Sequence, residues 1–139
     1  MSAHATFESA IRIRFHHCDP AGIIFYPQYF VLFNELVEDW FNEGLGIDFA
    51  RYHTAGRHGI PMAHVECDFV APSKVGEMLR FCLIVRRIGS SSLTLSVEAK
   101  AGDDVRVRAT LVVVQASLDT WRAVPFSDEL RDKLARYLA

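Results

Sequence analysis

The chain has 139 residues, of which 50% are apolar and 23% are charged, so it suits a single globular domain, residues 1–139, with one hydrophobic core. Its net charge of −2 argues against a nucleic-acid partner, and no run reaches the ~18 apolar residues of a membrane-spanning helix. The N-terminal residues lack an apolar core of signal-peptide length, and the three cysteines show no CxxC spacing. These features predict a cytoplasmic protein with reduced thiols and no membrane association.

The first predicted element is a strand over residues 8–15, in which apolar side chains alternate with Arg12 and Arg14. The side chains expected to face the core are Ile11, Ile13 and Phe15. A turn follows at residues 19–22, where Asp, Pro and Gly occupy the positions that a type I turn favours.

Residues 27–43 form the strongest predicted helix, because apolar residues recur at the i, i+3, i+4, i+7 spacing of one face. Residues on this face are Tyr29, Leu32, Phe33, Leu36, Val37 and Trp40. Pro27 suits the first helical position and Gly44 suits the end. The apolar face is widened by Phe30, Val31 and Phe41. We therefore expect most of this helix to be buried.

The rest of the chain is predicted to be mainly an antiparallel sheet. Asp48 suits the cap of a short helix before the sheet, and Ser127 suits the cap of a surface helix after it. The predicted strands are residues 64–70, 78–88, 93–100 and 105–114. Their short links and period-two patterning indicate antiparallel pairing with one solvated face. A buried helix followed by such strands predicts an α+β fold of the hotdog type, with a curled sheet around a central helix.

Residues 16–19 combine two histidines, a cysteine and an aspartate, which raises the possibility of a metal site or a cysteine nucleophile. Adjacent strand residues point to opposite faces, so these four side chains do not converge easily on one ion. A Cys18 nucleophile would need a base or a helix N-terminus to lower its pKa, and we expect Cys18 to be a small buried residue instead. The sequence therefore predicts neither a metal site nor a cofactor.

Asp19 has two interpretations. An aspartate that opens a type I turn is commonplace and needs no further role. However, Gly22 lets the backbone approach a ligand, and the helix that begins near Tyr26 presents unpaired N–H groups close to the carboxylate. Such donors can hold an oxyanion while the carboxylate attacks or activates water, which is a pattern typical of acyl transfer.

The stretch HCDPAGIIFYPQYF, followed by an aromatic-rich helix, resembles the aspartate-type 4-hydroxybenzoyl-CoA thioesterases of the hotdog superfamily. HGIPMAHVECDFVAPSKVGEML and WRAVP extend the resemblance over nearly the whole chain. The resemblance implies hydrolysis of an acyl-CoA with an aromatic acyl group, without a metal or cofactor. It also implies that Asp19 is the catalytic nucleophile or general base and that the Tyr26 backbone N–H polarises the thioester carbonyl. Such enzymes are homodimers or homotetramers with sites between subunits.

Four residues are expected to contact the acyl-CoA substrate: Gly22, Ile60, Arg87 and Ser91. By the resemblance, Ile60 replaces a hydroxyl-bearing residue near the reacting group. Residues 71–139 carry 11 Lys and Arg against 8 Asp and Glu, and Arg87 precedes a serine-rich turn that could add donors to a CoA phosphate. Arg106 and Arg108 are weaker candidates, because alternating arginines equally well solvate the outer face of a sheet.

Two other functions compete with hydrolysis by Asp19. One is a hotdog module that binds acyl-CoA without turning it over. The other is a metal-dependent hydrolase that uses His16 and His17, which the strand geometry disfavours.

Overall fold

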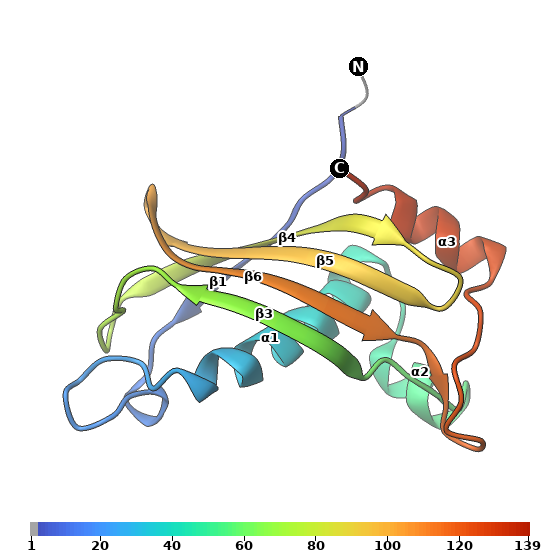
Figure 1. Cartoon of the computed structure of the whole chain (residues 1–139), viewed down its shortest axis with the longest axis horizontal. Helices are drawn as coiled ribbons and strands as arrows, with labels where there is room; N and C mark the ends of the chain where they lie inside the picture. The colour runs from blue at the N-terminus through green and yellow to red at the C-terminus, as the bar shows by residue number, and fades with distance from the viewer. Residues whose placement is uncertain (1–2) are drawn as a thin grey trace.

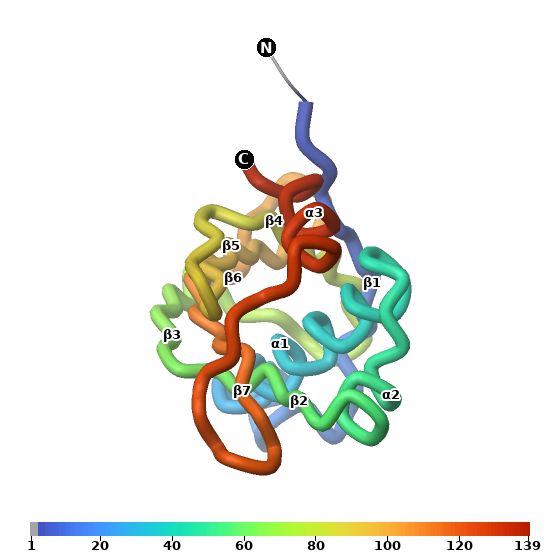
Figure 2. Tube along the Cα trace, turned by 90° about the vertical axis from the view of Figure 1, so that its right-hand side faces the viewer, coloured from blue at the N-terminus to red at the C-terminus, as the bar shows by residue number. Residues whose placement is uncertain are grey.

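The computed structural model describes residues 3–139 and shows a five-stranded antiparallel sheet curled over one long helix (Figure 1). The strand order is β1-β4-β5-β6-β3. The strands are β1 (Phe7–Arg12), β3 (Met62–Phe69), β4 (Met78–Ile88), β5 (Ser92–Ala101) and β6 (Asp104–Val114). The central helix is α1 (Pro27–Asp39). Figure 2 looks along the sheet and shows the strands arching around α1 from β3 to β1. This architecture confirms the predicted α+β hotdog fold.

The hydrophobic core lies between the concave face of the sheet and α1. Strands β4, β5 and β6 alternate buried and more exposed residues, as a strand with one covered face should. The predicted face of α1 is buried as expected, with Phe33 completely inaccessible and its ring 6.4 Å from that of Phe81 on β4. Each such large side chain contributes about 1.5–3 kcal/mol on full burial. Val31, which was expected to extend the buried face, is instead exposed.

The last turn of the central helix is π-helical over Trp40–Gly44, where the Leu45 N–H donates to the Trp40 carbonyl at 2.8 Å. A β-carbon at Gly44 would lie 2.6 Å from the Trp40 ring, so this tight turn accommodates only glycine. The helix therefore ends where the sequence predicted, although with a wider final turn.

The first strand is shorter than predicted. It ends at Arg12, and Phe15–His17 form a 3₁₀ turn, so Phe15 does not face the core and is 77% exposed. The reason lies in the partner strand, because Arg12 pairs with Met78, the first residue of β4. After Arg12 there is no further residue of β4 with which the chain can pair, although apolar residues continue to alternate in the sequence.

Both predicted helix caps are present. The Asp48 side chain accepts the Arg51 N–H at 3.1 Å at the start of α2 (Phe49–Thr54). Ser127 accepts the Leu130 N–H at 3.1 Å at the start of α3 (Asp128–Ala135). A separate two-stranded pair, β2 (His58–Gly59) with β7 (Ala116–Ser117), was not predicted. Within residues 3–139, no helix has the length and apolar character needed to cross a membrane.

Candidate active site

The Asp19 turn (residues 19–22) lies between the 3₁₀ turn and α1. The Gly22 N–H donates to the Asp19 carbonyl at 2.9 Å, and the Ala21 N–H donates to Oδ1 of the Asp19 carboxylate at 2.9 Å. Gly22 has φ +79°, a left-handed conformation that costs glycine little. Within the described chain, Oδ2 of Asp19 receives no hydrogen bond. The turn therefore orients the carboxylate through one oxygen and leaves the other available.

The loop that joins β3 to β4 (residues 70–77) holds the Asp19 turn in place. The Ile24 N–H donates to the Ser73 carbonyl at 2.9 Å, and the Val75 N–H donates to the Gly22 carbonyl at 3.0 Å. An antiparallel bridge between residues 23 and 74 lies between these two bonds. The turn is thus attached by backbone hydrogen bonds to the end of the sheet at which β4 begins.

The start of α1 provides a free backbone donor. The Phe25 N–H donates to the His17 carbonyl and the Gln28 N–H donates to the Phe25 carbonyl, both at 2.9 Å. Pro27 has no N–H. Among residues 3–139, no group accepts a hydrogen bond from the Tyr26 N–H. This donor lies at the positive end of the helix dipole, where an oxyanion is favoured.

An exposed aromatic patch (Phe25, Tyr26 and Phe69) surrounds this helix start. Tyr26 is 57% exposed, and its ring lies edge-on to that of Phe69 at 5.8 Å. Phe69 is the last residue of β3, which forms one edge of the sheet. Exposed aromatic clusters of this kind mark contact sites.

His17 and Cys18, beside Asp19, have structural partners. Nδ1 of the buried His17 accepts the Arg14 N–H at 2.8 Å, and burial together with neighbouring positive groups lowers the pKa of His17. The Cys18 thiol donates to the Arg14 carbonyl at 3.4 Å, and burial and the Asp19 carboxylate raise the pKa of Cys18. A thiol with a raised pKa is a poor nucleophile. Within residues 3–139, no cluster of three or more His, Cys, Asp or Glu side chains could hold a metal ion.

Ile60 is buried and lines an apolar groove of about 260 Å³ between α1 and β3. Val31, Phe49 and Met62 also line this groove. The groove lies along the edge of the sheet, and Ile60 lies two residues before Met62, the end of β3 that is farther from Phe69. From Met62 to Phe69 the eight residues of β3 span about 23 Å, at ~3.3 Å for each of the seven steps.

Arg87 and Ser91 also lie far from Asp19 within one chain. β4 runs from Met78, beside the Asp19 turn, to Arg87 near its other end, which is about 30 Å at ~3.3 Å per residue. Ser91 follows in the next turn, where its carbonyl accepts the Gln115 N–H at 2.7 Å. A single chain therefore places Asp19, Gly22 and the Tyr26 N–H in one short segment, residues 19–26, and places Ile60, Arg87 and Ser91 toward the other end of the sheet.

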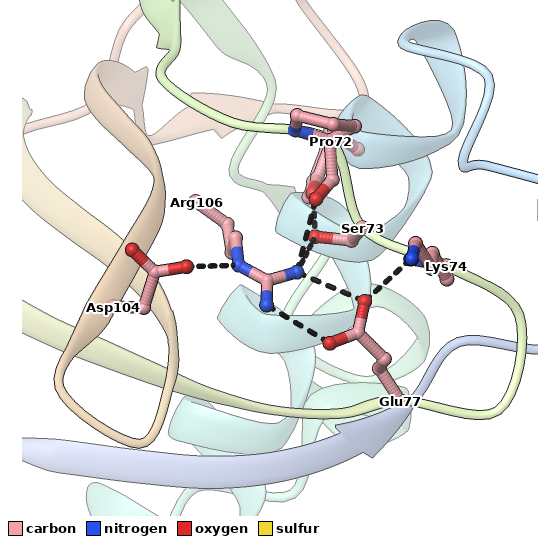
Figure 3. Close-up of polar contacts among 7 residues, drawn as sticks. Pro72, Ser73, Lys74, Glu77, Asp104 and Arg106 are labelled. Atoms are coloured by element: carbon pink, nitrogen blue, oxygen red, sulfur yellow. Dashed lines mark hydrogen bonds and ion pairs between the residues drawn. The ribbon is translucent and has the colours of Figure 1, made fainter.

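Arg106 and Arg108 have acidic partners, which favours the structural interpretation of both. Arg108 pairs with Glu98 at 3.2 Å on the exposed face. Arg106 makes a paired contact with Glu77, and its guanidinium lowers the pKa of Glu77 to about 2 (Figure 3). The sequence analysis did not predict this network. The only local indication of it was Asp104, which lies two residues before Arg106.

Comparisons with known proteins give a consistent picture. Residues 13–134 match the thioesterase-like superfamily. The 1,4-dihydroxy-2-naphthoyl-CoA hydrolase of Nostoc punctiforme is 25% identical over 128 residues, 91% of this chain and 82% of that protein. A 1,4-dihydroxy-2-naphthoyl-CoA thioesterase from Synechocystis has TM-score 0.84 and 19% identity, covering 94% of this chain and 96% of that one. A gentisyl-coenzyme A thioesterase has TM-score 0.83 and 22% identity, covering 92% of this chain and 99% of that one. These structural likenesses show a shared fold.

Proposed function

The chain belongs to the thioesterase-like superfamily, and from this premise we propose that it hydrolyses an acyl-CoA thioester to the free acid and CoA. The observation that carries the proposal is the combination of the Asp19 carboxylate, with one oxygen free, and the free Tyr26 N–H at the helix start. A carboxylate that can attack or activate water and a donor that stabilises the oxyanion can together hydrolyse a thioester.

The chemistry has two routes through Asp19. As a general base, Asp19 takes a proton from water, the resulting hydroxide attacks the carbonyl carbon, and the C–S bond breaks to release CoA. As a nucleophile, a carboxylate oxygen attacks directly, CoA leaves, and water hydrolyses the mixed anhydride. In both routes the carbonyl oxygen becomes negative, and the Tyr26 N–H at the positive helix end stabilises it.

The proposed acyl group is aromatic. The hydrolase from Nostoc punctiforme is named for a naphthoyl thioester, and one structural neighbour is named for a gentisyl thioester. Ile60 and Phe49 give the groove beside α1 an apolar lining that suits a ring. The substrates to compare are therefore 4-hydroxybenzoyl-CoA, 1,4-dihydroxy-2-naphthoyl-CoA and gentisyl-CoA.

The proposed enzyme is a homodimer or a homotetramer. β3 is an edge strand, and the aromatic patch at its end is exposed in one chain. If two copies pair through β3 in antiparallel fashion, the Asp19 end of one copy lies beside the Ile60 and Arg87 end of the other. This pairing would reunite the expected substrate contacts that a single chain separates. Light scattering should give at least a dimer, whereas a stable and active monomer would contradict the shared site.

The decisive experiment measures the release of free thiol from a panel of aryl-CoA and alkyl-CoA thioesters. Steady release, faster with aryl substrates, supports the proposal. Binding of acyl-CoA without thiol release would favour the alternative, a non-catalytic hotdog binding module. Loss of activity on addition of a chelator would favour a metal-dependent hydrolase instead.

The cytoplasmic location stays a prediction.

A further inference from the structure

Arg106 on β6 is the centre of a polar network beneath the loop of residues 70–77 (Figure 3). Its Nη1 and Nη2 donate to the two carboxylate oxygens of Glu77, each at 2.9 Å. Nε donates to Asp104 at 2.8 Å, and Nη1 also contacts the Pro72 carbonyl at 3.0 Å and the Ser73 hydroxyl at 3.2 Å. Only 12% of the Arg106 side chain is exposed. Every guanidinium nitrogen therefore has a partner, and the Arg106 side chain itself is largely shielded from water.

The network keeps its charges over a wide pH range. The Arg106 guanidinium and the Lys74 N–H, which donates to Glu77 at 2.6 Å, together hold the pKa of Glu77 at about 2. The Glu77 carboxylate in turn raises the pKa of Arg106. A paired contact between two ionised groups fixes geometry as well as charge, because the planar guanidinium matches the carboxylate.

The loop that Arg106 holds also touches α1. The Tyr29 hydroxyl donates to the Ser73 hydroxyl oxygen at 3.2 Å, and both residues are buried. Tyr29 lies in the first turn of α1, and its N–H donates to the Tyr26 carbonyl at 3.1 Å. The Ser73 carbonyl meanwhile accepts the Ile24 N–H from the segment that follows the Asp19 turn. Ser73 is thus bonded to the segments that adjoin both parts of the candidate active site.

We propose that Arg106 is a positioning residue that fixes the Asp19 turn relative to the start of α1 by holding the 70–77 loop through Glu77 and Ser73. This inference rests on the proposed thioesterase function. Among the described residues, Arg106 bonds to neither Asp19 nor Tyr26, so its effect is transmitted by the loop. Such an effect can be large, because a misplacement of about 1 Å can cost ~10²-fold in rate.

Arg108 provides a matched control. It lies two residues further along the same strand and pairs with Glu98, but its side chain is 58% exposed and bonds to no part of the 70–77 loop among the described residues. Arg106→Gln and Arg108→Gln therefore remove the same group from the same strand. Only the first change releases the loop.

The test measures kcat and KM with an aryl-CoA thioester, well below the melting temperature of each variant, and deuterium uptake over residues 19–26. We expect Arg106→Gln to lower kcat by about tenfold or more while KM stays within about twofold, because the loss is in alignment rather than in CoA binding. Deuterium uptake over residues 19–26 should rise, with no rise in β5. Arg108→Gln should match the wild type in all three measurements.

Glu77→Gln keeps the proposal testable if Arg106→Gln fails to fold, and it should lower kcat in the same direction by a smaller factor. A variant that only lowers the melting temperature, with kcat and deuterium uptake over residues 19–26 unchanged, would overturn the proposal. An equal loss of kcat in Arg108→Gln would overturn it as well. If the wild type releases no thiol from any acyl-CoA, the proposed function fails, and deuterium uptake still shows whether Arg106 holds the Asp19 turn.

Discussion

Ion pairs of different exposure lie at the two ends of the five-stranded sheet, one of them just outside it, beside β2 and β7. At the Asp19 end, Arg106 and Glu77 are 12% and 30% exposed. At the Ile60 end, Arg57 pairs with Asp119 at 3.0 Å, but these side chains are 53% and 63% exposed. Water and salt weaken exposed pairs much more than shielded ones. The Arg106–Glu77 pair at the end that carries the proposed chemistry is therefore expected to be stronger than the Arg57–Asp119 pair at the end that carries the proposed acyl contacts.

Backbone strain follows the same division. The two non-glycine residues with positive φ in the described chain, Arg57 at 53° and Trp121 at 61°, both lie at the Ile60 end. Their segments are joined by the Leu118 N–H, which donates to the Arg57 carbonyl at 2.9 Å. Such conformations cost about 1–3 kcal/mol each and persist where the surroundings impose them. At the Asp19 end, the positive φ values belong to Gly22, Gly76 and Gly102, for which they cost little.

The largest expected effect is that of Asp19→Asn. The amide keeps the shape of the side chain and can still accept the Ala21 N–H, but it removes the negative charge that both routes need. We expect turnover to fall by about 10² or more, the scale of losing a general base. Thiol release gives turnover, and a thermal melt confirms that the fold is intact. Near-normal turnover would rule out Asp19 as the catalytic group.

Glu77→Gln tests the ion pair with Arg106 at the Asp19 end. Like Asp19→Asn, it replaces a carboxylate by an amide. Hydrogen bonds to charged groups contribute about 1.5–3 kcal/mol, so we expect a loss of that order in the free energy of unfolding at neutral pH. Since the pKa of Glu77 falls from 4.5 to about 2 on folding, its contribution is complete above pH 4.5 and is lost as the pH falls toward 2. Urea denaturation at several pH values should show the two proteins converging in acid. A constant difference across pH would contradict the charged pair.

Much of the fold was predictable because its signals are local. The alternation over residues 78–88 identified β4 with its bounds, and the periodicity after Pro27 identified the buried face of α1. Phe15 was misplaced because the end of β1 depends on where its partner strand begins, which no local pattern contains. The β2–β7 pair was missed because two-residue strands joined across a long sequence separation leave no periodicity.

The site was predictable to a lesser extent. The turn chemistry placed Asp19 and Gly22 correctly in a turn, and Pro27 indicated the free N–H beside it. The catalytic roles of Asp19 and Tyr26 stay predictions. Arg106 was considered only as a phosphate ligand or as a residue solvating the outer face, and its shielded network was not predicted, because alternation along a strand predicts which face a side chain occupies but not whether a distant loop covers that face.

Arg87→Ala tests whether the Ile60 end binds the CoA phosphates. Among the described residues Arg87 has no acidic partner, so its charge is available to a ligand. We expect KM for an acyl-CoA to rise by about three- to tenfold with kcat largely unchanged, because a phosphate contact is the same in the ground and transition states. A pantetheine thioester, which lacks the nucleotide, should not distinguish the two proteins. A defect of equal size on both substrates would place phosphate binding elsewhere.

Asp119→Asn should have the smallest effect and completes the comparison between the two ends. It removes one charge from an exposed pair without changing the backbone at Arg57, so we expect a loss of about 0.2–1 kcal/mol in the free energy of unfolding. Added salt should reduce this loss further, because it screens exposed charges most. The loss caused by Glu77→Gln should persist under the same conditions, and deuterium uptake over residues 19–26 should rise in Glu77→Gln alone. If Asp119→Asn cost as much as Glu77→Gln, or loosened the Asp19 turn equally, exposure would not explain how the two ends differ.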